Sequence, residues 1–424
     1  MAMLEQPLDW TAVPPARATL MRTLGRYGIS SLGPVAVSGA HFLASLVFLR
    51  NLPAREFGLF SFVLVIVPFC MSLCVALICV PLTQNLATGD RPACFKMNGL
   101  LCALYAAAIF AALRFGQAPA RAALILALFG GVFAWRWFAR CFAYVENRMG
   151  AAVASDLVYG VLLAAALTAL VLTKHVTLLY GSVALLASAL VALIPFGGNF
   201  FREQVAALRT ARFSEYRPIF HDLTRWSLTG MVLTEATVNA HAYLVTFIAG
   251  PGAFALLALG MLLMRPAALV QGALPDLERP AMARAIAAKD WSGLARISRH
   301  FTFGLAAAWL ATLLAGAALL AWAPQLLLKK GYPLDQVALV AALSAAIMAV
   351  RVLRTPLSVL LQAAGEFKAL AGIGLVSGVL SVSATLALLL AFGPIASLGG
   401  VLLGELAILL RCRALAGEWQ RGHD

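Results

Sequence analysis

The chain has few charged residues and no long polar segment. Only 12% of its 424 residues are charged and 62% are hydrophobic, against about 25% and about 45–50% in an ordinary soluble domain. Apolar stretches of about 20 residues follow one another with short basic hinges between them, and such a stretch spans a bilayer as a helix. These stretches use nearly the whole chain and leave no room for a soluble catalytic domain. The sequence predicts a polytopic helical membrane protein.

Motifs for two kinds of chemistry are also missing. No Gly-x-x-x-x-Gly-Lys-Ser/Thr phosphate loop is present, which excludes ATP hydrolysis by that route. The seven cysteines are odd in number and contain no Cys-x-x-Cys pair. We therefore expect neither a metal site nor a disulfide framework.

Twelve spans are predicted in two sets of six, giving an all-α protein with about twelve transmembrane helices in two six-helix lobes around a central cavity. The spans are 32–50, 58–80, 97–114, 120–140, 151–172 and 176–196, then 226–249, 252–274, 301–323, 334–354, 370–391 and 395–411. The predicted divisions are an N-terminal segment 1–31, an N-lobe 32–196, a linker 197–225, a C-lobe 226–411 and a tail 412–424.

Lysine and arginine are distributed unequally between the two sides. With a cytoplasmic N-terminus, 24 lie in inside segments, seven lie in outside segments, and Arg265 lies within a span. The positive-inside rule then places both termini in the cytoplasm. The net charge of +14 is explained by cations that face anionic headgroups, so no nucleic-acid partner is expected. The run after residue 31 is too long for a signal peptide and is retained as the first helix.

The predicted outside loops are short, and their only acids are Glu56 and Asp335. Membrane enzymes that use lipid-linked sugars typically carry a long outside loop with catalytic acids or arginines. A membrane glycosyltransferase or polymerase is therefore the least favoured class, and we expect a transporter rather than an enzyme.

The two halves of the chain resemble each other in three places that occur in the same order. The matches are 157–162 with 375–380, Ala40-His41 with Ala240-His241, and Arg136 and Arg140 with Arg351 and Arg354. Because each half has an even number of spans, both enter the membrane in the same direction. Parallel repeats of this kind usually build transporters with a cavity between two lobes.

Ionisable residues inside spans are costly and mark candidate functional positions. The interior candidates are His41, Glu235, Asn239, His241, Arg265 and Glu405. One interpretation is a polar, mostly cationic cavity between the lobes with one or two protonatable groups. The other is a set of structural contacts between helices, for instance a Glu235–Arg265 pair.

Arg136, Arg140, Arg351 and Arg354 lie near the inside ends of two spans. Singly, each is best explained as an anchor whose charged tip reaches the membrane surface. Their matching positions also allow a cationic entrance for a diphosphate, because the guanidinium group pairs with phosphate oxygens in a bidentate way.

Two hinges carry a resemblance to a known family. Arg50-Asn51-Leu52 with Glu56-Phe57-Gly58-Leu59-Phe60 resembles the first hinge of polysaccharide flippases, the Wzx-like branch of the multidrug/oligosaccharidyl-lipid/polysaccharide exporter superfamily. Residues 361–368 are similar to the hinge that these proteins place between helices ten and eleven. The resemblance implies flipping of undecaprenyl-diphosphate-linked oligosaccharide units across the bacterial inner (cytoplasmic) membrane during exopolysaccharide, capsule or O-antigen synthesis. Partners would be this lipid-linked oligosaccharide, the bilayer, and the polysaccharide polymerase and export machinery.

In such proteins the sugar–diphosphate head passes through a cationic central cavity while the lipid tail stays in the bilayer. No cofactor is expected beyond a coupling proton or sodium gradient. The resemblance gives Arg265, His41, His241, Asn239 and Arg50 as head-group contacts, and Glu235 and Glu405 as coupling residues.

Two relatives of that branch remain as alternatives. A multidrug/cation antiporter of the same superfamily would share the architecture but usually needs acids for a cationic drug, whereas this interior is basic. The lipid II flippase branch usually has two additional helices, for which the chain has no room.

The charge distribution predicts the topology directly. Reporter fusions at Gln117, Lys174 and Lys330 should report the periplasm, and fusions at Gly89, Ala207 and Lys289 the cytoplasm. A periplasmic signal from the 197–225 linker would contradict the two-lobe arrangement.

Overall fold

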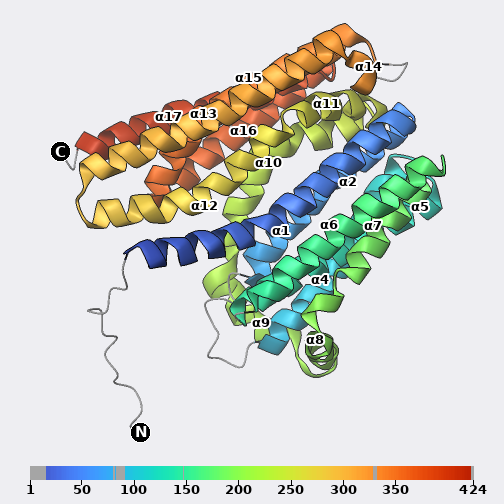
Figure 1. The fold of residues 1–424 in the computed structure, drawn as a ribbon, viewed down its shortest axis with the longest axis horizontal. Coiled ribbons are helices and arrows are strands. Elements are labelled where there is room, and N and C mark those ends of the chain that lie inside the picture. The colour runs from blue at the N-terminus through green and yellow to red at the C-terminus, as the bar shows by residue number, and fades with distance from the viewer. Residues whose placement is uncertain (1–15, 80–81, 83–90, 147, 328–331, 422–424) are drawn as a thin grey trace.

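The computed structural model describes residues 16–421 apart from 80–81, 83–90, 147 and 328–331, so Gly89 and Lys330 lie outside it. Within this part of the chain every regular element is a helix (Figure 1). The elements are α1 (Ala16–Asn51), α2 (Ala54–Cys74), η1 (Val75–Cys79), α4 (Arg91–Phe115), α5 (Ala120–Val145), α6 (Met149–Leu172), α7 (Leu178–Val191), η2 (Ile194–Phe196), α8 (Gly198–Thr210), η3 (Phe213–Glu215), α9 (Tyr216–Ile219), η4 (Phe220–Thr224), α10 (Arg225–Ile248), α11 (Pro251–Leu263), α12 (Arg265–Ala287), α13 (Trp291–Trp322), α14 (Pro324–Leu327), α15 (Leu334–Ala363), α16 (Phe367–Phe392) and α17 (Ser397–Arg421).

Each of the twelve predicted spans coincides with a helix or a pair of helices. By length and composition, nine helices among the described residues could cross a membrane, and the bent pair α11 and α12 would be a tenth. The remaining two predicted spans, 226–249 and 395–411, correspond to α10 and α17. Both helices carry charged residues, among them Glu235 in α10 and Glu405 in α17. The protein is therefore an all-α polytopic membrane protein, as the sequence predicted.

Several predicted boundaries differ from the observed ones. The candidate membrane span Gly33–Asn51 agrees with the first predicted span, but the helix that contains it begins earlier, because α1 starts at Ala16 and includes half of the proposed segment 1–31. The tail is also helical, because α17 continues to Arg421. Within the linker 197–225, α8 is a separate amphipathic helix that packs on α4, where Gln204 Nε2 donates a hydrogen bond of 2.8 Å to the Phe95 carbonyl.

Corresponding helices pack in the same pairs in both halves of the chain. The helix α1 packs on α6 as α10 packs on α16, and α5 packs on α7 as α15 packs on α17. Likewise α4 packs on α5 as α13 packs on α15. This pairing gives an N-lobe of α1, α2 and α4–α7 and a C-lobe of α10–α13 and α15–α17, and it agrees with the internal repeat seen in the sequence.

The two lobes meet mainly through α2 and α11. The Phe62 ring of α2 packs edge-to-face against Phe247 and Phe254, with centroids 5.5 and 6.4 Å apart. Gly58 lies directly on the Pro251 carbonyl, where a Cβ atom would overlap it. At the other end, where α1 begins and α17 ends, the lobes diverge (Figure 1). We call the end with Gly58 and Pro251 the closed end.

Prolines affect the predicted spans in different ways. Pro34 and Pro68 lie inside α1 and α2, which continue through them. At Pro266 the predicted span is interrupted, because α11 ends at Leu263, α12 begins at Arg265, and the two helices meet at 62°. Proline lacks the N–H that would continue a helix and is accommodated in its first turn. Arg265 therefore lies at the bend of a broken span.

The closed end depends on the absence of a side chain at position 58. Gly58→Ala should separate α2 from α11 and lower the free energy of unfolding by about 1–3 kcal/mol, because the new methyl group overlaps backbone. Thermal melting of the purified protein measures this change. Gly39→Ala is the matched control, because a Cβ there meets nothing within 4 Å. Equal melting temperatures for the two variants would contradict the proposed role of Gly58.

Candidate functional site

Two arginines and one acid form a buried cluster in the N-lobe. Arg136 Nη1 lies 2.7 Å from Asp156 Oδ1, and Arg140 Nη2 lies 3.0 Å from Asp156 Oδ2. The three side chains are only 1%, 7% and 1% exposed, respectively. We call these residues the N-lobe cluster. The structure thus places Arg136 and Arg140 inside the lobe and bound to an acid, rather than free at an entrance.

Small residues on neighbouring helices make room for the N-lobe cluster. Gly33 of α1 faces the Asp156 carboxylate so closely that a Cβ atom would collide with it. One turn further along, Gly160 of α6 lies against the Ala36 backbone. The Ser155 hydroxyl donates to the Ala192 carbonyl at 2.6 Å and lies 3.3 Å from Arg136. The cluster therefore connects α1, α5, α6 and the end of α7.

A second cluster lies at the matching place in the C-lobe. Arg351 Nε donates to Glu405 Oε1 at 2.7 Å, and Arg354 Nε donates to Glu405 Oε2 at 2.6 Å. Glu405 is 0% exposed, whereas the two arginine side chains are 17% and 21% exposed. We call these residues the C-lobe cluster. Glu405, predicted to be a coupling residue, is the common acid of two ion pairs.

The two clusters lie at similar depths. Arg136 is 16 residues beyond the start of α5, and Arg351 is 17 residues beyond the start of α15. At about 1.5 Å per residue, both lie about 25 Å along their helices. The sequence repeat of these arginines therefore corresponds to a repeated position in three dimensions.

The two histidines lie inside the lobes. His41 Nε2 and the Tyr159 hydroxyl are 2.7 Å apart, and the His41 ring packs against Phe133 with centroids 5.4 Å apart. His241 Nε2 lies 3.2 Å from the Met261 sulfur. Both side chains are buried, at 8% and 2% exposed. In this conformation each histidine contacts helices of its own lobe.

Glu235 lies on α10 with two neutral partners. The Asn239 amide donates to Glu235 Oε1 at 3.0 Å, and the Tyr243 hydroxyl donates to the same oxygen at 2.6 Å. The Tyr243 ring in turn packs against Phe62 and Phe69 of α2. The Glu235–Arg265 pair considered from the sequence is not formed. Glu235 instead lies at the contact between α10 and the N-lobe.

A cavity of about 320 Å³ lies between the lobes and contains Arg265. Arg265 forms no ion pair with any residue that the structure describes. The positive end of the α12 helix dipole lies at the same place and adds to the positive potential. The polar lining comes from Ser45, Ser61 and Arg265, and the apolar lining from Phe57, Leu64, Val65, Phe254, Ala258, Met261, Leu262, Ala268 and Leu269. We call this space the Arg265 cavity.

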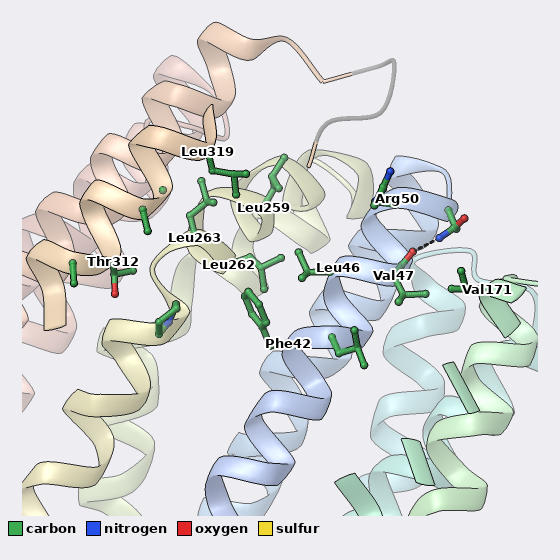
Figure 2. Close-up of a pocket in the computed structure, with 16 residues that line it drawn as sticks. Phe42, Leu46, Val47, Arg50, Val171, Leu259, Leu262, Leu263, Thr312 and Leu319 are labelled. Carbon is green, nitrogen blue, oxygen red and sulfur yellow. Dashed lines mark hydrogen bonds between the residues drawn. The ribbon is translucent and has the colours of Figure 1, made fainter. Parts of the chain in front are cut away.

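A larger groove of about 1050 Å³ opens beside that cavity (Figure 2). Phe42 and Leu46 of α1 form one wall, and Leu262 and Leu263 of α11 form the other. The C-lobe side is completed by α13, and Arg50 lies at the N-lobe rim. Leu262 lines both spaces, so the two adjoin. We call this space the lateral groove; the structure places Arg50 here and not in the Arg265 cavity.

Asp156 is a buried site residue that the sequence did not single out. It lies only seven residues beyond the start of α6. Acids near a helix end are common, so its position alone did not mark it as a candidate. The sequence did contain a signal for this ion pair, because Asp156 is an acid in the span that directly follows the one with Arg136 and Arg140. Among the described residues no group of three or more His, Cys, Asp or Glu is placed to hold a metal ion.

Comparisons with known proteins identify the fold. No protein-family model and no curated protein matches the sequence. An inward-facing multidrug resistance MATE family transporter of the MOP superfamily superposes with a TM-score of 0.66 at 14% identity, covering 91% of this chain and 96% of that one. The lipid II flippase MurJ, in an inward closed conformation, gives 0.59 at 12% identity, covering 90% and 86%.

A third solved structure is a MOP superfamily transporter from Pyrococcus furiosus, described as having a binding pocket of reverse polarity. It gives a TM-score of 0.57 at 12% identity and covers 93% of each chain. Two of the three are described as MOP superfamily transporters and one as a lipid II flippase. At these identities the likeness establishes the fold of the chain, which is that of MOP superfamily transporters.

The N-lobe cluster should be essential for folding. Asp156→Asn leaves two buried guanidinium groups without their anion, and removal of one partner from a buried ion pair costs about 3–5 kcal/mol. We expect a marked loss of thermal stability and of protein abundance in the membrane. Glu203→Gln, on the exposed face of α8, is the matched control. Replacing Arg136 and Arg140 by methionine in the Asp156→Asn background should restore part of the stability; no recovery would argue against the charge explanation.

Proposed function

We propose that the protein flips undecaprenyl-diphosphate-linked oligosaccharide units across the bacterial inner membrane, with both termini in the cytoplasm. It would serve exopolysaccharide, capsule or O-antigen synthesis as a transporter rather than an enzyme. The observation that carries this proposal is the adjacency of the Arg265 cavity and the lateral groove, which share Leu262. The cavity contains the cation Arg265 within mainly apolar walls, and the groove has mainly apolar walls from α1, α11 and α13.

A lipid-linked diphosphate has the two properties that these spaces match. Its head is anionic and hydrophilic, and Arg265 is a half-buried cation without an acidic partner among the described residues. A guanidinium group binds phosphate oxygens in a bidentate way, and a charge inside a membrane protein is retained where it has a function. The tail is a hydrocarbon, which the leucine-rich walls of the lateral groove can accept without loss of backbone or polar contacts.

The other predicted contacts take different places in this proposal. Arg50 lies at the rim of the lateral groove, where it would meet the charged head as it leaves the cavity at the closed end. His41 and His241 do not line the Arg265 cavity, so any contact with the head group requires another conformation. Asn239 binds Glu235 and would act through it.

Coupling to a proton or sodium gradient is assigned to Glu235 rather than to Glu405. Among the described residues, Glu235 accepts hydrogen bonds only from neutral groups, Asn239 and Tyr243, and it lies at the contact between the lobes. Binding a cation there would change the contact that holds the lobes together. Glu405 is already bound by two arginines.

A multidrug/cation antiporter is the second candidate. Solved structures with this fold include MATE family transporters, and Glu235 is an acid that could meet a cationic drug. The described interior opposes it, because five arginines, at 136, 140, 265, 351 and 354, stand against three acids, at 156, 235 and 405. A cationic ligand would be repelled by this excess.

The decisive experiment locates the substrate when the protein is missing. A deletion strain should accumulate complete repeat units on undecaprenyl diphosphate at the cytoplasmic face and make no external polymer. Arg265→Ala should reproduce this defect at normal protein abundance, and Arg265→Lys should retain part of the export. Lipid extracts, with and without an externally added glycosidase, give the measurement.

Each rival gives a different result in the same experiment. An enzyme that builds the unit would leave a truncated sugar chain, and a polymerase would leave complete units open to the glycosidase. A drug carrier would leave polymer unchanged and raise sensitivity to cationic drugs. Arg121→Ala, at an exposed cation on the closed end, is the control and should export normally.

A further inference from the structure

The two arginine clusters differ in the nitrogen atoms that hold the acid. In the N-lobe cluster the tips of the guanidinium groups, Arg136 Nη1 and Arg140 Nη2, bind Asp156. In the C-lobe cluster both arginines bind Glu405 through Nε. The Nη groups of Arg351 and Arg354 form no hydrogen bond within the described part of the chain, and both side chains keep partial exposure. These Nη donors therefore have no partner among the described residues and belong to partly exposed side chains.

The clusters also differ in how their excess charge is compensated. Each has two cations and one acid, which leaves one positive charge. In the N-lobe the Arg136 guanidinium lies 4.5 Å from the Phe133 ring centroid and 4.8 Å from that of Tyr159. Arg140 lies 4.5 Å from the Trp137 ring centroid. Aromatic faces stabilise a cation and compensate the excess charge of the N-lobe cluster. Its remaining donors include Arg136 Nε and Arg140 Nε, which are buried and form no hydrogen bond with any residue that the structure describes.

No such compensation is described for the C-lobe cluster. Among the described residues no aromatic ring faces Arg351 or Arg354 within cation–π distance. The neighbouring α12 contributes a neutral group, because Gln271 donates to the Thr355 hydroxyl at 2.9 Å. A lasting excess charge inside a membrane protein is costly. An anion that bound to the free tips would remove that cost.

We propose that Arg351 and Arg354, positioned by Glu405, bind a phosphate or diphosphate group inside the C-lobe. Because the Nε atoms are fixed by the two carboxylate oxygens, the planar forks keep their orientation and present their Nη donors together. Two forks suit the several oxygens of such a group and its charge. Where the ligand is the diphosphate of a lipid-linked sugar, the site rests on the proposed function and gives the head a second binding position in addition to the one at Arg265. The phosphate of an anionic lipid headgroup has the same chemistry.

The test measures the binding of inorganic pyrophosphate to the purified protein in phosphatidylcholine nanodiscs. Isothermal titration calorimetry gives the affinity. The double variant Arg351→Lys/Arg354→Lys keeps both charges and the ion pairs to Glu405 but loses the free forks. We expect its affinity to fall about ten-fold or more, since charge-assisted hydrogen bonds are lost. Its melting temperature without ligand should stay close to that of the parent. Arg121→Lys is the control and should bind pyrophosphate normally.

The outcomes separate the possible sources and the alternatives. Pyrophosphate affinity that is unchanged by added phosphatidylglycerol indicates a diphosphate ligand, whereas competition by phosphatidylglycerol indicates a lipid headgroup; both support the site. Equal affinity of the parent and the double lysine variant, or no binding by the parent under either lipid composition, would overturn it. Should the double variant fail to fold, Arg354→Lys alone leaves the Arg351–Glu405 pair intact and should still weaken binding. Because no lipid-linked sugar is used, failure here leaves the deletion-strain result standing.

Discussion

The cost of placing charge in a membrane interior determines how this protein is built. Asp156 and Glu405 each hold two arginines, and each acid is almost completely buried. An isolated cation at that depth would be expensive, so every arginine of the two clusters has an acid, and those of the N-lobe also have aromatic faces. The pairs connect α5 to α6 and α15 to α17 and so fix the helix order within each lobe.

Rigid lobes of this kind can move as units only if the contact between them is small. That contact is concentrated on α2 and α11 at the closed end, where Gly58 meets Pro251 and Phe62 meets two further rings. The broken span at Arg265 lies directly beside it. Bent or discontinuous helices commonly form the binding sites of transporters, because their ends expose backbone dipoles and side chains to a cavity. Arg265 and Leu262 lie at this break, and Leu262, Leu263 and Pro266 line the lateral groove there.

The internal repeat is close in architecture and divergent in chemistry. The same pairs of helices pack together in both lobes, and arginines recur at similar depths. Yet the acid comes from the fifth span in one lobe and from the sixth in the other. The arginines are enclosed in the N-lobe and partly exposed in the C-lobe. Such a difference lets one lobe serve as a stable frame while the other keeps donors for a ligand.

The amino-acid sequence by itself determined that this is a helical membrane protein, where its spans lie and that its halves repeat. Long apolar stretches and basic hinges are local properties of the sequence, and they decide which segments enter a bilayer and in which direction. It also singled out Arg265 and Glu405, since a charge within an apolar run stands out without any fold. It did not reveal Asp156, which lies near a helix end, nor that Arg136 and Arg140 are enclosed while Arg351 and Arg354 keep free donors. Partners across helices depend on how the helices rotate and pack against one another. Only the tertiary structure decides which acid each arginine meets, and with which nitrogen.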